Sequence, residues 1–214
     1  MKKLLSIAIL TLFANAIFAQ QTVDPKARAV LDRAVQTLQR TSGVTADFQI
    51  LMEAGQSDAR QTLNGSLWLK GNKFKLVVPG VETYFDGRTQ WVYMTDAREV
   101  TISNPTREEL QEINPTALLS SYRDGYKIEY DAERQEGGRT IHDINLYPTD
   151  LRKDFFRINI KIEKDTHNLV SIKTYDKSGS STTITLTRYQ SNVPLEDAVF
   201  TFRSIPGVEE IDLR

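Results

Sequence analysis

The sequence has no cysteine and only two histidines among its 214 residues. Without cysteine there is no disulfide bond, no thiol nucleophile and no thiolate ligand for a metal ion. His142 falls on a predicted strand beside Asp143, and neighbouring side chains on a strand point to opposite faces. His167 falls in a predicted turn. We therefore expect both histidines to be structural or surface residues and not catalysts.

The sequence also lacks the motifs of the common enzyme classes. It contains no H-E-x-x-H, no G-x-S-x-G, no phosphate-binding loop and no G-x-G-x-x-G. The acidic residues Glu108, Glu109 and Glu112 lack the spacing of a metal site. The 27 basic and 28 acidic residues leave no positive excess for binding nucleic acid. These absences predict a protein that is not an enzyme, binds no cofactor or metal, and has no nucleic-acid partner.

A long hydrophobic run occurs at one place only, near the N-terminus. The apolar segment Leu4–Phe13 follows two lysines and is too short to cross a bilayer comfortably. Small residues follow it, so we predict a secretory signal peptide, residues 1–19, cleaved after Ala19. Cleavage after Ala16 and an uncleaved anchor are the alternatives. Because no cysteine follows the run, the chain is not expected to be lipidated itself. Residues 20–214 are predicted to form a single domain.

The first element after this signal is a predicted helix. Asp24 can cap its N-terminus, and Pro25 suits the first turn. Gly43, shortly after Arg40, suggests where the helix stops. The apolar face repeats at helical spacing through Ala27, Val30, Leu31, Ala34, Val35 and Leu38.

Predicted strands occupy most of the remaining chain. Apolar and polar residues alternate along each of them, and turn residues such as Asp86-Gly87 separate them. Ten or so strands in a meander indicate one large antiparallel sheet, which accumulated twist should curl. The predicted strands are Val44–Ala54, Gln61–Lys70, Lys73–Val78, Val81–Phe85, Thr89–Thr95, Arg98–Ser103, Tyr126–Tyr130, Ile141–Tyr147, Phe155–Glu163, Leu169–Tyr175 and Thr182–Tyr189.

The segment Asn104–Gly125 interrupts the strands. Thr106 and Glu109 have the spacing of a capping box, and Asn114-Pro115 can begin a second short helix. The predicted fold class is therefore mainly β with a helical lid (α+β). A curved antiparallel sheet forms an unclosed β-barrel, and the N-terminal helix and this mid-chain insert cover it.

Three motifs connect this pattern to a known family. The first begins at Gly65 as G-S-L-W-L-K-G-N-K-F-K-L and continues to Tyr93 as Y-F-D-G-R-T-Q-W-V-Y. The second is the run N-P-T-A-L-L from Asn114, and the third is F-T-F from Phe200 followed by P-G-V. In order and spacing the chain resembles the periplasmic outer-membrane lipoprotein carrier family, LolA. That resemblance implies an unclosed barrel with a helical lid, whose hydrophobic cavity binds the acyl chains of lipoproteins.

An apolar inner face of the sheet fits this function, although the sequence does not separate a cavity from a filled core. Trp68 and Trp91 lie on the opposite parity from their apolar neighbours, so we expect them to pack on the sheet surface or edge. The candidate acyl-binding residues are Phe48, Ile50, Met52, Leu67, Leu69, Leu76, Val78, Val92, Met94, Ile158, Ile160, Ile162, Ile184 and Leu186. The candidate lid residues are Leu110, Ile113, Leu118, Leu119 and Tyr122.

The chain departs from the family at one position. Members typically carry an arginine directly after W-x-K that helps to hold the lid closed, whereas here Gly71 and Asn72 follow Lys70. A lysine does not replace the planar fork of donors on arginine. We therefore expect a lid that is held more weakly, or by different bonds.

The resemblance also implies partners. Cargo would come from an inner-membrane lipoprotein-releasing ABC transporter and pass to the outer membrane, in some bacteria to an acceptor there; we expect a monomer. The alternative is another periplasmic lipid- or lipopeptide-binding or sensing protein of the same fold. An acceptor would normally be lipidated on cysteine, and a sensor would normally carry a second domain. A periplasmic hydrolase is a third reading, with no motif in its favour.

Overall fold

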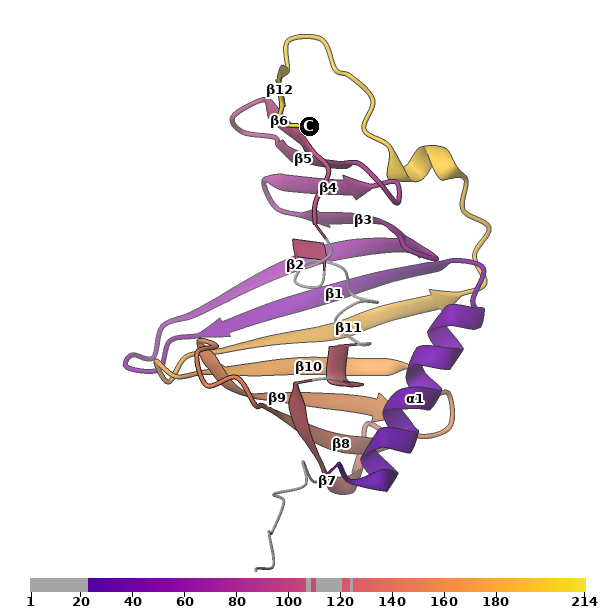
Figure 1. Ribbon diagram of the computed structural model, residues 1–214, viewed down its shortest axis with the longest axis vertical. Helices are drawn as coiled ribbons and strands as arrows, with labels where there is room; N and C mark the ends of the chain where they lie inside the picture. The colour runs from indigo at the N-terminus through magenta and orange to yellow at the C-terminus, as the bar shows by residue number, and fades with distance from the viewer. Residues whose placement is uncertain (1–22, 107–108, 111–120, 124) are drawn as a thin grey trace, which may run out of the picture.

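The computed structural model describes residues 23–106, 109–110, 121–123 and 125–214. The predicted signal peptide lies outside them. One helix, α1 (Pro25–Arg40), lies across one face of a large sheet (Figure 1). The strands are β1 (Val44–Glu53), β2 (Arg60–Lys70), β3 (Lys73–Val78), β4 (Val81–Phe85), β5 (Gln90–Met94), β6 (Glu99–Ser103), β7 (Tyr126–Glu136), β8 (Arg139–Pro148), β9 (Phe155–Glu163), β10 (Leu169–Asp176), β11 (Ser181–Ser191) and β12 (Glu209–Asp212). Two single-turn 3₁₀ helices are η1 (Ser121–Arg123) and η2 (Asp197–Phe200).

The start of α1 is confirmed and the role expected for Gly43 is wrong. Asp24 Oδ1 accepts hydrogen bonds from the backbone N–H of Lys26 at 2.8 Å and of Ala27 at 3.2 Å. The helix ends at Arg40, where the Thr41 hydroxyl donates to the carbonyl of Thr37. Gly43 is instead needed because a side chain there would clash with the carbonyl oxygen of Val193.

The twelve strands form a single sheet that does not close, as the sequence indicates. Their order is β12-β6-β5-β4-β3-β2-β1-β11-β10-β9-β8-β7. The sheet is therefore not the single meander that we expected. β1–β6 and β7–β11 are two meanders, joined where β1 pairs with β11. The chain passes from one edge to the other through residues 104–125. At the far edge β12 pairs with β6 in parallel, an element that the sequence analysis did not include.

The capping box at the start of the mid-chain insert is confirmed. The Thr106 N–H donates to Glu109 Oε2 at 2.7 Å, and the Glu109 N–H donates to Thr106 Oγ1 at 3.3 Å. Glu109 and Leu110 are helical. The helix expected from Asn114-Pro115 lies outside the described residues, so the helical insert as a whole stays a prediction.

The main core lies between α1 and the sheet. α1 crosses the ends of β8–β11 near the bottom of Figure 1, and its apolar face meets inward side chains of β7–β10. The buried cluster consists of Ala27, Val30, Leu31, Ala34, Val35, Tyr122, Tyr126, Ile128, Ile144, Leu146, Ile158, Ile160, Ile162 and Ile172. No helix in the described part of the chain combines the length and hydrophobicity needed to span a bilayer.

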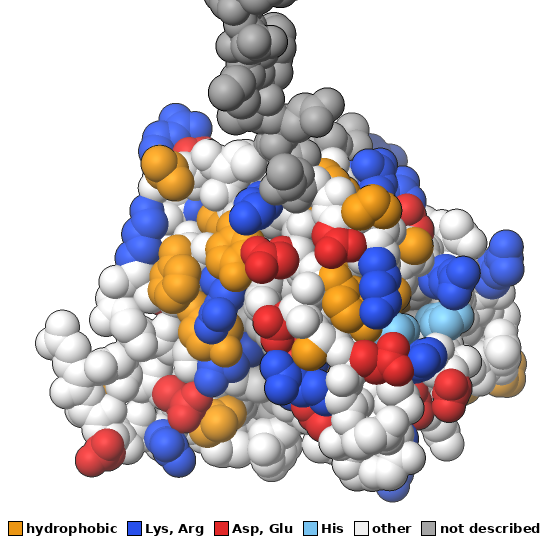
Figure 2. All heavy atoms as spheres, turned by 90° about the horizontal axis from the view of Figure 1, so that it is seen from below, with side chains coloured by type: hydrophobic (Ala, Val, Ile, Leu, Met, Phe, Trp, Pro, Cys, Tyr) orange, Lys and Arg blue, Asp and Glu red, His pale blue; other side chains and the backbone are white. Residues whose placement is uncertain are grey.

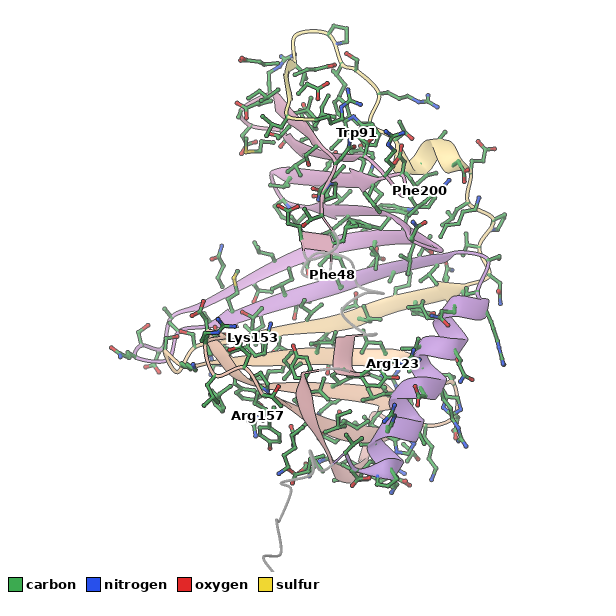
Figure 3. The ribbon with its side chains drawn as sticks, in the orientation of Figure 1. Phe48, Trp91, Arg123, Lys153, Arg157 and Phe200 are labelled. Carbon is green, nitrogen blue, oxygen red and sulfur yellow. The ribbon has the colours of Figure 1, made fainter. Side chains whose placement is uncertain are left out.

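The C-terminal segment returns along the sheet to its far edge. After β11 it passes through η2 and then reaches β12 (Figure 1). Phe200, labelled beside η2 in Figure 3, is completely buried. Phe202 packs against the rings of Tyr84 and Tyr93 at centroid distances of 5.8 and 5.4 Å. These aromatic contacts attach the segment to the sheet.

Candidate functional site

An apolar cavity lies on the same face of the sheet as α1. Its volume is about 450 Å³. One wall is the C-terminal half of α1, through Ala34 and Leu38, and the floor is formed by inward side chains of β1–β5, β10 and β11. The lining residues are Ala34, Leu38, Val44, Ala46, Phe48, Ile50, Leu67, Leu69, Phe74, Leu76, Val78, Thr83, Gln90, Val92, His167, Asn168, Leu169, Ile172, Ile184, Leu186 and Tyr189.

Strand pairing explains why these side chains meet. Side chains of directly opposed residues in an antiparallel pair share one face. Ile50 is opposed by Leu63 on β2 and by Ile184 on β11, and Leu76 is opposed by Leu67 and Thr83. The period-2 alternation of each strand therefore places one continuous apolar surface on the cavity side.

Most of the candidate acyl-binding residues come together on this surface. They are Phe48, Ile50, Leu67, Leu69, Leu76, Val78, Val92, Ile184 and Leu186. The two tryptophans, Trp68 and Trp91, do not line the cavity. Whether the gathered residues contact acyl chains stays a prediction.

The other candidates lie elsewhere. Ile158, Ile160 and Ile162 are buried in the core cluster that also contains the apolar face of α1. Met52 lies near the end of β1, outside the cavity, and Met94 is an exposed residue at the end of β5. Alternation identified the correct face of each strand, but it did not show which part of that face the helix covers.

Sequence reasoning missed several lining residues. Val44 and Ala46 share the parity of Phe48, and Phe74 shares that of Leu76, so alternation contained the signal. Helical spacing places Ala34 and Leu38 on the apolar face of the helix, but it does not show that this face also borders a cavity. The polar lining residues Thr83, Gln90, His167 and Asn168 had no such signal, since only the topology brings them to the cavity.

Phe48 lies on β1 in the middle of the sheet (Figure 3). A side chain at Gly65, directly opposite on β2, would clash with its ring. The ring therefore occupies space that the glycine leaves open, and Phe48 is 5% exposed although it lines the cavity. The glycine of the first motif thus has a packing role at the cavity floor.

The chain is similar in sequence to known proteins. A family model described as "Outer membrane lipoprotein carrier protein LolA" matches residues 39–203. The chain belongs to this family. The outer-membrane lipoprotein carrier protein of Hahella chejuensis is 29% identical over 221 aligned positions, which cover 98% of this chain and 96% of that protein. The protein of the same name from Histophilus somni is 29% identical and covers 83% of this chain and 84% of its own length.

Solved structures agree on the fold. An uncharacterized conserved protein from Thermus thermophilus has a TM-score of 0.63 at 12% identity, covering 87% of this chain and 99% of that one. The lipoprotein LppX of Mycobacterium tuberculosis has a TM-score of 0.51 at 18% identity, covering 81% and 98%. At such identities the likeness concerns the fold alone.

Two of the residues expected in a LolA lid are described by the structure. Leu110 packs against the buried cluster of Val44, Leu69, Phe74 and Phe85. Tyr122 is fully buried beneath α1, and its hydroxyl donates to Asp32 Oδ1 at 2.6 Å. Burial, and then this bond to a carboxylate, raise the pKa of Tyr122. Ile113, Leu118 and Leu119 lie outside the described residues.

Arg123 adds a second bond between this segment and the helix. It is the last residue of η1, labelled in Figure 3, and its Nη2 is 3.3 Å from Asp32 Oδ1. The insert is therefore attached to α1 where it returns to the sheet at β7.

The lysines near the position of the LolA arginine have a different partner. Lys70 Nζ donates to the Leu195 carbonyl at 2.8 Å and to Asp197 Oδ1 at 2.9 Å. Lys73 Nζ donates to Asp197 Oδ2 at 2.7 Å. Both lysines thus hold the C-terminal segment at η2. How the lid is held concerns residues that are not described, and our expectation of a weaker lid stays a prediction.

The described residues include a buried histidine that bonds to a tyrosine. His142 is buried, its Nδ1 is 2.7 Å from the Tyr130 hydroxyl, and burial lowers its pKa. Within the described ranges, no three histidine or acidic side chains gather as a metal site. The arrangement that the structure does present is an apolar cavity, which can bind an apolar guest.

Proposed function

We propose that this protein is a periplasmic carrier for lipoproteins. It binds the acyl chains of a lipoprotein in the apolar cavity and carries them from an inner-membrane ABC transporter to the outer membrane. The observation that carries the proposal is the apolar cavity bounded by the described residues, lined by residues of the first motif of the LolA family, including Leu67, Leu69 and Leu76. The names of the relatives support lipoprotein as the cargo.

The cavity has a suitable size for fatty chains. If a methylene takes about the 30 Å³ that a water molecule occupies in the liquid, the 450 Å³ cavity has room for about 15 methylenes. One long acyl chain therefore fits in this conformation, and further chains require the cavity to widen. Burying a methylene is worth about 0.8 kcal/mol, so one chain gains about 12 kcal/mol relative to water.

This gain is close to what the chain already has in a membrane. A fatty chain inside a bilayer is shielded from water in the same way, so transfer between bilayer and protein costs little net free energy. The carrier therefore needs neither a covalent step nor a cofactor of its own. Loading and release depend on the membrane partners, of which the ABC transporter is the proposed donor and an outer-membrane acceptor an additional one.

Export to the periplasm is part of the proposal. Residues 1–19 have the composition of a signal peptide, and cleavage after Ala19 would leave residues 20–214 as the working protein. N-terminal sequencing of the protein purified from periplasm tests this directly. A mature protein that still contains Leu4–Phe13 would contradict it.

The function is tested by capturing cargo. Protein purified from its own periplasm is analysed by native mass spectrometry, and bound lipoprotein is expected. In parallel, an acylated lipoprotein and its unacylated form are compared in a pull-down. Recovery of the acylated form alone is expected, and equal recovery of both would contradict binding through lipid. Free lipid instead of lipoprotein would favour the alternative, a general lipid-binding or sensing role.

A matched pair of variants assigns binding to the cavity. Leu186 lines the cavity, whereas its neighbour Thr185 lies on the opposite face of β11, in a polar groove. Leu186→Arg is expected to abolish capture of the acylated form, and Thr185→Arg to leave it unchanged. Circular dichroism and thermal unfolding confirm that both variants fold. Capture that survives Leu186→Arg would place the acyl chains elsewhere.

A further inference from the structure

The lining of the cavity is polar at the turn between β9 and β10. His167 and Asn168 line the cavity beside apolar residues of α1, β10 and β11. His167 Nδ1 is buried and has no hydrogen-bond partner in the structure. A buried polar atom without a partner costs free energy, and such atoms are rare in folded proteins. A ligand with a hydrogen-bonding group could supply the partner that this imidazole lacks.

The turn that carries the two residues is tightly built. The His167 N–H donates to the Glu163 carbonyl, and the Glu163 N–H donates to the Asn168 carbonyl, both at 2.9 Å. Thr166 Oγ1 accepts from the Asn168 N–H at 3.2 Å and donates to Glu163 Oε2 at 3.0 Å. The backbone of residues 167 and 168 is thus held in place before any ligand arrives.

His167 adopts the left-handed region of backbone space, with a φ of 57°. Asparagine, aspartate and histidine are the non-glycine residues that adopt this region most often. The turn therefore accepts a histidine, and it places that residue at the cavity.

The other polar residues of the wall do not share these properties. Thr83 and Gln90 lie on β4 and β5, which belong to the first meander, whereas His167 and Asn168 lie in the second. Among the described residues, no atom of Thr83 or Gln90 is a buried polar atom that lacks a partner. Figure 2 shows histidine side chains at the surface of one face of the molecule, and Asp165 and Thr166 of the β9–β10 turn are exposed, so this turn is also close to solvent.

We propose that His167 and Asn168 form a site for the polar head of the acyl cargo. The imidazole, turned so that a ring N–H faces the cavity, and the Asn168 carboxamide donate hydrogen bonds to the carbonyl oxygens of the ester or amide groups, while the hydrocarbon chain extends along the apolar wall. This deepens the proposed function and depends on it. It assigns to the cavity a preference for chains bearing a carbonyl group over bare hydrocarbon, with the head at the β9–β10 turn.

The test compares two ligands that differ only in the carbonyl oxygens. One is a synthetic dipalmitoyl lipopeptide with ester-linked chains, and the other is its dialkyl ether analogue. The unmodified protein is expected to bind the ester about 3- to 10-fold more tightly, as one net hydrogen bond allows. Equal affinities for the two ligands would overturn the head-group site. Failure to bind either ligand would instead overturn the proposed carrier function.

Variants then assign the preference to the turn. His167→Gly keeps a residue suited to the left-handed conformation and removes the side-chain donor, so the melting temperature is expected to stay about the same. Both His167→Gly and Asn168→Ala are expected to reduce the ester preference toward one, leaving ether affinity unchanged. Leu186→Ala is the control, and it should weaken both ligands equally. Equal weakening of ester and ether by His167→Gly would show a structural role and overturn the proposal.

A third ligand distinguishes the source of the carbonyl group. Palmitic acid presents a free carboxylate, whereas a lipoprotein presents esters and an amide. The proposal expects His167→Gly to change lipopeptide affinity more than palmitate affinity. Dependence on His167 for palmitate alone would show a fatty-acid site and overturn the assignment to an esterified head.

Discussion

Two regions of one sheet surface differ in how their apolar side chains are covered. In the filled region, Ile144, Leu146, Ile158, Ile160 and Ile162 pack against α1 and are almost completely buried. In the hollow region, side chains such as Ile50, Leu76, Ile184 and Leu186 face a cavity and stay partly exposed. Both regions contain the same types of aliphatic residue on strands of the same sheet. The difference lies in the cover and not in the composition.

The geometry of the helix accounts for this difference. α1 has 16 residues and lies across β8–β11 near one end of the sheet (Figure 1). A helix of this length spans about 24 Å at 1.5 Å per residue, which is far less than the width of a sheet of twelve strands about 4.8 Å apart. The helix therefore fills one part of the concave face and leaves the rest for another occupant. Under the proposed function this division is useful, because the filled region stabilises the fold and leaves the hollow region to a guest.

The strongest test of the comparison is to remove the same side chain from each region. Ile160→Ala in the filled region is expected to reduce the free energy of unfolding by about 2–5 kcal/mol, since it creates a cavity in a packed core. Ile184→Ala in the hollow region should cost about 1 kcal/mol, because its side chain already lacks neighbours on one side. Urea unfolding measures both values. Equal costs would mean that the two regions are equally packed.

Enlarging an alanine in each region is a second test, since added volume is harmful in a packed core and harmless where there is space. Ala27 is fully buried in the filled region, and Ala27→Leu is expected to destabilise the protein by about 1–3 kcal/mol through overpacking. Ala46 lines the cavity, so Ala46→Leu has space and should leave stability unchanged or raise it. Lipopeptide affinity is expected to fall for Ala46→Leu only. Similar destabilisation by both substitutions would argue against free space near Ala46.

These two tests also show what the sequence could predict. Alternation placed Ile160 and Ile184 on the same face of the sheet, which is correct. It could not separate the filled from the hollow region, because that depends on where a distant helix crosses the strands. Alternation predicted the strands because it is a local feature of the chain, whereas the open barrel with a lid was implied by the resemblance of the motifs to a known family. The pairing of β1 with β11 and the cavity polar groups at His167 and Asn168 depend on long-range topology.

The missed strand segments have a local cause. The second half of β7, Ala132–Glu136, contains almost only polar residues and has no apolar alternation. Its partners become evident only in the structure, where Arg134 bonds to Asp143 and Glu136 to Lys161. β12 has four residues and pairs in parallel with β6, and so short a polar strand carries no signal of its own.

The hollow region predicts how affinity depends on chain length. Each added methylene should tighten binding about 4-fold, which corresponds to about 0.8 kcal/mol, until the cavity is filled at about 15 methylenes. Beyond that length the affinity should level off. Lipopeptides with chains of 8 to 18 carbons, measured by calorimetry, check this. A continued increase to the longest chain would show that the cavity widens around its guest.

The smallest expected effect concerns the C-terminal segment, which lies outside both regions. Hydrogen bonds from Lys73 and Lys70 lower the pKa of the Asp197 carboxyl to about 2, from an ordinary value of 3.8. Between these pH values the folded state binds fewer protons than the unfolded state. The stability that the contact contributes is therefore present above about pH 4 and lost as the pH falls through 2.

Asp197→Asn should accordingly lower the melting temperature slightly at pH 7, with a difference from the unmodified protein that shrinks below pH 4. Because Asp197 is well exposed, salt should weaken the effect. Asp58→Asn, in the exposed turn between β1 and β2, is the control and should have no effect at either pH. Hydrogen exchange is expected to rise around η2 in Asp197→Asn while the cavity strands keep their protection. Loss of protection in β2 and β3 as well would mean that the two lysines stabilise the hollow region and not only the segment that crosses its edge.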